Sequence, residues 1–173
     1  PVRVIHLSTV WTIVLDVLAW LVLQPGMAYV AARLPLASLR PEGWLYRSRA
    51  WERDGAIYQT VFAVRRWKAA LPSGGQALGS FSMARLASSD AAYLRRWCVE
   101  TCRAELAHWL QIAVMPLFML WNPPQATAML ALYALAVNLP CIIAQRYNRP
   151  RLQRALLRAT SACIKTGGLR HPS

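Results

Sequence analysis

The sequence contains few acidic residues. Only seven Asp and Glu residues stand against 20 Lys and Arg residues, which gives a formal net charge of +13. Hydrophobic residues nevertheless make up 56% of the 173 residues. A water-soluble domain of this length needs more polar surface than this composition supplies. The composition therefore argues against an ordinary soluble fold and predicts a membrane protein, in a chain with room for one domain over residues 1–173.

Cysteines are also few, and their spacing does not suggest a metal site. Cys98 and Cys102 lie one helical turn apart, and the other two cysteines are Cys141 and Cys163. No second Cys/His pair has the spacing of zinc ligands, so we expect reduced thiols and no metal ion. The basic charge borders apolar segments and no nucleic-acid-binding module is recognisable, so no nucleic-acid partner is expected.

Long apolar segments predict an all-α integral membrane protein. Three segments suit spanning helices, at about residues 4–32, 106–121 and 126–144. An α-helix rises about 1.5 Å per residue, so about 20 apolar residues cross a hydrocarbon layer of about 30 Å. Pro25 is expected to kink the first helix or to end it early. A charge-free turn at 122–125 is expected to join the second and third helices.

The distribution of basic residues predicts the orientation of these helices. Residues 33–105 contain twelve Lys and Arg residues and the tail at 146–173 contains seven, whereas the turn at 122–125 contains none. Lys and Arg accumulate on the cytoplasmic side of membranes. We therefore expect a multi-pass protein of the cell inner (cytoplasmic) membrane, with both basic segments in the cytoplasm.

The segment between the first two apolar segments is expected to lie on the membrane surface. Aromatic and basic residues alternate from Trp44 to Leu71, which predicts an amphipathic interfacial helix with its rings at headgroup depth. Within it, Arg66, Trp67 and Lys68 suit the phosphates of an acyl donor; the alternative is a face that binds lipid headgroups. A Ser- and Gly-rich loop is expected over residues 73–89, before a new helix capped near Asp90.

A cluster of ionisable residues lies where this new helix would enter the membrane. Successive residues of a helix are rotated by about 100°, so Glu105 and His108 differ by about 60° and can touch. A histidine beside a carboxylate and partly withdrawn from water suits general base catalysis. Arg103 and Glu100 form a second pair of the same spacing. The alternative is that these charges only hold neighbouring helices together.

A second polar cluster follows the third apolar segment. If that segment is helical, Asn138, Gln145 and Arg149 share one face, and amide and guanidinium groups suit sugar hydroxyls or a phosphate. The alternative is a helix that ends at Tyr147–Pro150, with arginines that snorkel to the membrane surface. Asp16, a lone acid in the first segment, is expected either to pair with Arg or Asn from another helix or to face a polar cavity.

Three stretches together resemble a known family, in the same order along the chain. They are residues 51–68, residues 100–109 (Glu-Thr-Cys-Arg-Ala-Glu-Leu-Ala-His-Trp) and residues 145–152 (Gln-Arg-Tyr-Asn-Arg-Pro-Arg-Leu). The chain resembles the glycosyl-4,4'-diaponeurosporenoate acyltransferases over residues 50–155. That family esterifies a sugar hydroxyl of a glycosylated carotenoid acid with a fatty acyl chain. The resemblance implies that Glu105 and His108 are its Glu-x-x-His pair. It also implies that these residues match polar positions around the pair: Arg103, Asn138, Gln145, Arg146, Asn148 and Arg149.

The predicted function is transfer of a fatty acyl group to a hydroxyl of a membrane glycolipid such as a glycosyl carotenoid. The donor would be a cytoplasmic thioester, acyl-CoA or acyl-carrier protein, and no cofactor is expected. His108 would act as the base and Glu105 would orient it, with Arg103, Arg146 or Arg149 near the developing oxyanion. The candidate substrate-binding residues are Glu100, Asn138, Gln145, Arg146, Asn148, Arg149, Arg66, Trp67 and Lys68. The alternative is a non-enzymatic lipid- or pigment-binding subunit of a larger membrane complex.

Overall fold

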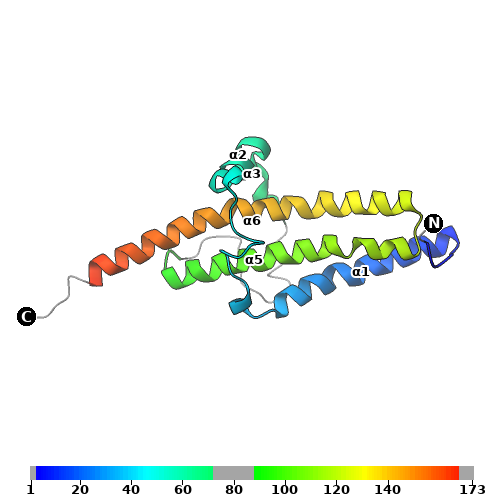
Figure 1. Cartoon of the computed structure of the whole chain (residues 1–173), viewed down its shortest axis with the longest axis horizontal. Coiled ribbons are helices and arrows are strands. Elements are labelled where there is room, and N and C mark those ends of the chain that lie inside the picture. The colour runs from blue at the N-terminus through cyan, green and yellow to red at the C-terminus, as the bar shows by residue number, and fades with distance from the viewer. Residues whose placement is uncertain (1–2, 72–87, 168–173) are drawn as a thin grey trace, which may run out of the picture. The chain divides into compact units, whose positions relative to one another are not determined.

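The computed structural model describes residues 3–71 and 88–167, with side chains described up to residue 162. These residues form helices and irregular segments and contain no strand, which confirms the all-α prediction. Most of the expected Ser- and Gly-rich loop at 73–89 lies outside the described residues. The longer helices, drawn in Figure 1, are α1 (Thr9–Arg33), α5 (Ala91–Ala113) and α6 (Pro124–Gly167).

The chain divides into two compact units. We call residues 1–34 and 104–142 the apolar unit, and residues 35–103 and 143–173 the basic unit. Arg3 and Arg33 are the only Lys or Arg residues in the sequence of the apolar unit. Helices α5 and α6 each begin in one unit and end in the other.

The apolar unit is a packing of helical segments around aromatic side chains. It combines α1, the end of α5, the 3₁₀ helix η4 (Met115–Leu120) and the beginning of α6, which run side by side (Figure 1). Phe118 is fully buried, and the Trp20 ring lies 6.1 Å from it and 5.3 Å from the Tyr133 ring, centroid to centroid. Such ring contacts add to the apolar burial that holds α1 against the other segments.

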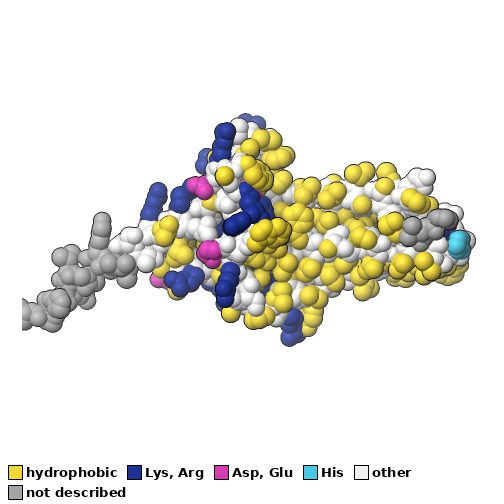
Figure 2. Space-filling view, viewed as in Figure 1, with side chains coloured by type: hydrophobic (Ala, Val, Ile, Leu, Met, Phe, Trp, Pro, Cys, Tyr) yellow, Lys and Arg dark blue, Asp and Glu magenta, His cyan; other side chains and the backbone are white. Residues whose placement is uncertain are grey.

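The outer surface of the apolar unit is itself apolar. Trp11 and Leu21 on α1 and Met129 on α6 each expose more than half of their surface, and Figure 2 shows apolar side chains over the visible face of this unit. Soluble proteins rarely expose continuous apolar surfaces of this kind. Helix α1 and the Pro124–Ala162 part of α6 are both long and apolar enough to cross a membrane.

The second predicted span is not one continuous α-helix, whereas the first continues past the proline that was expected to kink it or end it early. Helix α5 ends at Ala113, and the chain continues through Pro116 as the 3₁₀ helix η4, so residues 106–121 are not a single α-helix. Proline lacks the N–H that an α-helix needs and clashes with the preceding turn. Helix α1, in contrast, runs through Pro25 to its end at Arg33.

The predicted amphipathic helix of the basic unit is wrong. The chain instead forms short elements: η2 (Ala50–Gly55), α2 (Ala56–Phe62), α3 (Val64–Trp67) and η3 (Lys68–Ala70). Left-handed residues interrupt the helix at two places, with φ of 48° at Arg53, 52° at Asp54, 79° at Gly55 and 48° at Ala63. A left-handed residue reverses the local winding of the backbone, so one straight helix cannot pass through these positions.

Gly55 lies at one of these interruptions and packs closely against α6, which continues without a break. Helix α6 continues through Pro150, so the alternative in which Tyr147–Pro150 ends the helix is wrong. Pro150 has no N–H to offer the Arg146 carbonyl, its partner in a regular helix. Gly55 approaches α6 here, where a Cβ would lie 3.2 Å from the Arg146 oxygen and 3.3 Å from the Tyr147 oxygen. A glycine suits both the left-handed φ and this close approach.

Helix α5 begins where the sequence predicts. Asp90 Oδ2 accepts hydrogen bonds from the backbone N–H groups of Ala92 at 3.0 Å and Tyr93 at 3.3 Å, and the Asp90 N–H donates to Ser88 Oγ at 3.0 Å. These bonds satisfy N–H groups that the first turn of a helix otherwise leaves free. The predicted helix start near Asp90 is therefore confirmed.

Candidate active site

A network of neutral polar side chains lies within the apolar unit. His108 on α5 places its Nδ1 atom 2.8 Å from Asn138 Oδ1 on α6 and 3.2 Å from Gln111 Oε1, one turn further along α5. Gln111 Nε2 in turn donates to the Gln24 carbonyl of α1 at 3.0 Å. The network therefore connects α1, α5 and α6 through an imidazole and two amides.

The directions of these hydrogen bonds fix the tautomer of His108. The amide nitrogen of Asn138 donates to the Ala134 carbonyl at 2.9 Å, and that of Gln111 donates to the Gln24 carbonyl. Both amides therefore turn their oxygen atoms, which only accept, toward His108 Nδ1. A neutral His108 must then carry its proton on Nδ1 and keep the lone pair on Nε2. This is the form that a general base needs.

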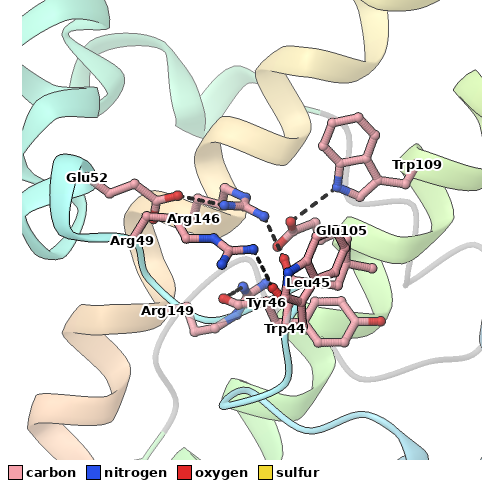
Figure 3. Close-up of polar contacts among 9 residues, drawn as sticks. All are labelled: Trp44, Leu45, Tyr46, Arg49, Glu52, Glu105, Trp109, Arg146 and Arg149. Atoms are coloured by element: carbon pink, nitrogen blue, oxygen red, sulfur yellow. Dashed lines mark hydrogen bonds and ion pairs between the residues drawn. The ribbon is translucent and has the colours of Figure 1, made fainter.

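The expected contact between Glu105 and His108 is wrong. The Glu105 carboxylate, which is fully buried, accepts a hydrogen bond from Trp109 Nε1 at 3.2 Å (Figure 3). Trp109 lies four residues further along α5 and meets Glu105 on the same face of the helix. The described hydrogen bonds of the His108 ring go to amide oxygens instead, since the ring turns toward Asn138 on α6.

Asp16 holds the turn between η4 and α6. Its Oδ1 atom accepts hydrogen bonds from Trp121 Nε1 at 2.8 Å and from Asn122 Nδ2 at 2.6 Å. Asp16 therefore pairs with an Asn, as one of the two expectations has it, but Asn122 lies in a turn and not in another helix. Nearby, the backbone N–H groups of Val4 and Ile5 both donate to the Leu120 carbonyl. These contacts make Asp16 a structural residue of the turn.

In the basic unit, Arg146 joins α6 to the segment that precedes η2. Its Nη1 lies 2.6 Å from Glu52 Oε1, and its Nη2 donates to the Leu45 carbonyl at 2.6 Å (Figure 3). Glu52 is only 1% exposed. Burial, followed by the negative charge of Glu52, raises the pKa of Tyr58 to about 12. Charge-assisted hydrogen bonds of this kind are stronger than neutral ones and fix geometry.

Arg149 occupies the centre of a second set of contacts in the basic unit. Its Nε donates to Thr101 Oγ1 at 2.9 Å, its Nη2 to the Thr101 carbonyl at 3.1 Å and its Nη1 to the Tyr46 carbonyl at 2.7 Å. Arg149 is 2% exposed, and all three guanidinium nitrogens donate to protein groups. This arrangement favours a structural role for Arg149 over the predicted role beside an oxyanion.

Glu100 and Arg103 form the ion pair that their spacing predicts. Arg103 Nη1 lies 3.1 Å from Glu100 Oε2, and Arg96 Nε lies 2.8 Å from Glu100 Oε1. Glu100 is buried between these two cations. The predicted role of Arg103 in catalysis, and that of Gln145 in binding substrate, stay predictions.

The cysteines described by the structure are free thiols, as predicted. Cys98, Cys102 and Cys141 are all buried. Burial raises the pKa of Cys98 to about 11, so this thiol is protonated at neutral pH. A protonated, buried thiol is a poor nucleophile. Transfer through a cysteine acyl-enzyme therefore has no support at Cys98.

The three residues of the predicted phosphate-binding motif, Arg66, Trp67 and Lys68, have different surroundings, and their role stays a prediction. Lys68 Nζ donates to Asn148 Oδ1 at 2.8 Å, which brings two predicted binding residues together. Trp67 Nε1 donates to the Phe62 carbonyl at 2.7 Å, and the Arg66 side chain is exposed. Its neighbour Arg65, which belongs to the same basic stretch of the sequence, points toward α6 instead and donates to the Tyr147 hydroxyl at 2.8 Å.

Comparison with known proteins decides the family. The sequence model described as glycosyl-4,4'-diaponeurosporenoate acyltransferase matches residues 42–158, which is more than half of the chain. The chain belongs to this family. Relatives of that name from Staphylococcus aureus strains RF122 / ET3-1 and USA300 are each 32% identical over 154 residues, covering 88% of this chain and 89% of the relative. No solved structure matches the chain.

Membership of the glycosyl-4,4'-diaponeurosporenoate acyltransferase family makes the chain an acyltransferase. The matched residues include His108, Gln111 and Asn138, and the arginine contacts of the basic unit. The sequence points to His108 and Asn138 separately but not to their contact, and it misses Gln111 altogether. The three-residue spacing from His108 to Gln111 on one helix is the signal that indicates the second of these partners.

Proposed function

We propose that the chain is a membrane acyltransferase that moves a fatty acyl group from a cytoplasmic thioester to a sugar hydroxyl of a membrane glycolipid such as a glycosyl carotenoid. The names of the relatives support the acceptor, and the two apolar helices support the membrane location. The observation that carries the chemistry is the His108 network, because it leaves an unprotonated imidazole nitrogen in a unit whose outer surface is apolar.

In the proposed reaction, His108 Nε2 accepts the proton of the sugar hydroxyl as its oxygen attacks the thioester carbonyl. The tetrahedral intermediate then collapses, the carbon–sulfur bond breaks, and the thiolate takes the proton from the imidazolium. Products are the ester and the free thiol, and His108 returns to its starting form. General base catalysis of this kind contributes about 10²–10⁴-fold to a rate.

Three side chains, those of Asn138, Gln111 and Glu105, are proposed to support the charged form of His108. The Nδ1–H donates to Asn138 and Gln111, so the ring keeps its orientation while Nε2 gains and loses its proton. Glu105 is buried one helical turn before His108. Its carboxylate would stabilise the imidazolium through space, without a direct hydrogen bond, because charges interact strongly where water is excluded.

We also propose three membrane crossings, with the basic segments in the cytoplasm. The first and third use α1 and the apolar beginning of α6. The second uses the end of α5 followed by η4. A 3₁₀ helix rises about 2.0 Å per residue, against about 1.5 Å for an α-helix. The break at Pro116 therefore lengthens a short segment toward the thickness of the hydrocarbon layer.

The test uses two sets of cells that both contain a glycosyl carotenoid, of which only one expresses the chain. Their lipid extracts are then compared. Mass spectrometry is expected to find a glycolipid heavier by one fatty acyl group only where the chain is present. Identical lipids in both extracts, with the chain co-purifying in fixed stoichiometry with a large complex, would instead support the non-enzymatic subunit.

A further inference from the structure

Tyr147 is surrounded by three cationic side chains in the basic unit. Arg65 Nε donates to its hydroxyl at 2.8 Å. Arg151 Cζ lies 3.5 Å from the centroid of its ring, and Lys68 Nζ lies 5.0 Å from it. Tyr147 itself is only 1% exposed, so its ring forms a fixed base on which the cations lie.

The positive charge of this cluster has no acidic partner within the part of the chain that the structure describes. Among residues 3–71 and 88–162, no carboxylate forms an ion pair with Arg65, Lys68 or Arg151. The acids of the basic unit that form ion pairs do so with other arginines: Glu52 with Arg146, Asp54 with Arg154, and Glu100 with Arg96 and Arg103. Three cations at such distances repel one another, and a bound anion would relieve that repulsion.

The titration of Lys68 agrees with this geometry. Burial lowers the pKa of Lys68, and the positive charges of Arg151 and Arg65 lower it further, although Tyr147 acts in the opposite direction. The one oxygen that Lys68 is described as bonding is neutral, Oδ1 of Asn148 at 2.8 Å. The ammonium is therefore held in place while its charge stays available.

The cluster is built on well-packed elements. Val64 at the start of α3 is fully buried, and it packs with Tyr58 and Tyr147 in one apolar core. Gly55 lies against α6 at the same level, where a Cβ would come 3.4 Å from Arg151 Nη1. Side chains held by rigid elements lose little freedom when a ligand binds.

We infer that Arg65, Lys68 and Arg151 bind a phosphate group on the Tyr147 base. Guanidinium and ammonium groups are the side chains that recognise phosphate oxygens, and the arginine fork adds geometry. Within the proposed function, the phosphate belongs either to the acyl donor, as in coenzyme A, or to the headgroup of an anionic lipid. Both ligands present the same chemistry to the cluster.

The experiment measures binding to the purified full chain, without any acyl transfer. One arm titrates coenzyme A into the protein in an uncharged detergent. The other arm compares nanodiscs of phosphatidylcholine with nanodiscs that contain phosphatidylglycerol. Saturable binding of coenzyme A is expected if the phosphate belongs to the donor, and preference for phosphatidylglycerol if it belongs to a headgroup. Either result supports the site, and binding in neither arm overturns it.

Matched variants separate the site from the general positive charge of the protein. Arg151→Gln and Lys68→Gln are each expected to weaken binding at least tenfold, and Arg151→Lys to restore part of it. Arg154→Gln removes the same charge from α6 three residues away, but this exposed arginine pairs with Asp54 at 3.6 Å. It is expected to change binding less than twofold. Equal effects of Arg151→Gln and Arg154→Gln would overturn the site.

The proposed function and this site fail in different ways. A chain that binds phosphate as described but transfers no acyl group would contradict the proposed reaction and leave the site standing. A chain that transfers acyl groups while Arg151→Gln and Lys68→Gln bind as the wild type does would contradict the site alone. If Arg151→Gln does not fold, as judged by circular dichroism, the partly exposed Lys68→Gln decides the question.

Discussion

The His108 network of the apolar unit and the arginine contacts of the basic unit use different chemistry. In the apolar unit the network at His108 consists of an imidazole, two amides and backbone carbonyls. In the basic unit, guanidinium groups form the buried contacts, as in Arg146 with Glu52 and Arg149 with Thr101. Both sets of contacts join segments far apart in the sequence, but only the second uses full charges.

The difference follows from the cost of removing charge from water. An unpaired charge in an apolar environment is far more costly than a hydrogen-bonded neutral group. Neutral hydrogen bonds therefore suit a unit with an apolar outer surface, and they suit the neutral form of the proposed base His108. Arginine contacts suit a unit rich in basic side chains, where Figure 2 shows Lys and Arg gathered on the visible face.

The largest expected effect is the loss of activity in His108→Ala. Removing the proposed base is expected to lower the rate of acyl transfer by about 10²–10⁴-fold, because no other group of the network can accept the proton. The protein should still fold and insert, as judged by circular dichroism and membrane fractionation. His6→Ala, which changes an exposed histidine, is the matched control and should keep the wild-type rate. Near-wild-type turnover of His108→Ala would exclude the proposed base.

In the basic unit the largest effect is expected on stability. Arg149→Ala removes three buried hydrogen bonds to Tyr46 and Thr101, and a hydrogen bond from a charged donor is worth about 1.5–3 kcal/mol. We expect the free energy of unfolding in detergent to fall by about 3 kcal/mol or more. Arg158→Ala, at an exposed position on the same helix, should leave it nearly unchanged. Equal free energies of unfolding for the two variants would show that the Arg149 contacts contribute little to stability.

A smaller effect is expected when only the charge of the buried ion pair is removed. Glu52→Gln keeps a hydrogen-bond acceptor for Arg146 but removes the negative charge 2.6 Å from its partly buried guanidinium, which should cost about 2 kcal/mol. Asp54→Asn changes an exposed acid whose pair with Arg154 is 3.6 Å long, and it should cost less than about 0.5 kcal/mol. Thermal unfolding of both variants measures the difference. An equal cost would mean that burial does not distinguish the two pairs.

The smallest effect is expected from removing one partner of His108. Asn138→Leu deletes one neutral hydrogen bond worth about 1 kcal/mol, and Gln111 remains to hold the Nδ1–H, so activity should fall by about tenfold or less. The activity of the double variant Asn138→Leu, Gln111→Leu should fall by more than the two single effects combined, since neither amide then fixes the tautomer of His108. Cys141→Ala, one turn further along α6, serves as the control. A double variant with wild-type turnover would remove the amides from the mechanism.

Much of the fold follows from local sequence signals. The apolar segments predict α1 and the beginning of α6, and Asp90 predicts the start of α5, because length, hydropathy and capping act over a few residues. The Glu100–Arg103 pair follows from helical spacing in the same way. A polar partner for Asp16 is expected, since a lone acid among apolar residues needs one, and Asn122 is that partner.

The features that the sequence does not predict depend on distant contacts. Ala63 adopts φ of 48° although its residue type does not indicate a left-handed conformation, and the amphipathic pattern around it predicts one helix. Spacing alone favours Glu105 as the partner of His108, but α6 supplies Asn138 from 30 residues away. Likewise the cations around Tyr147 come from two segments more than 75 residues apart, so the sequence indicates Lys68 as a candidate but does not predict that Arg151 lies beside it.

The most direct measurement is the tautomer of His108 in the protein labelled with ¹⁵N-histidine. At a pH where the ring is neutral, the ¹⁵N chemical shifts identify which ring nitrogen carries the proton, and the spectrum of His108→Gln assigns the signals. A proton on Nδ1 with an unprotonated Nε2 is the predicted result. A neutral ring protonated on Nε2 would contradict the amide-held base.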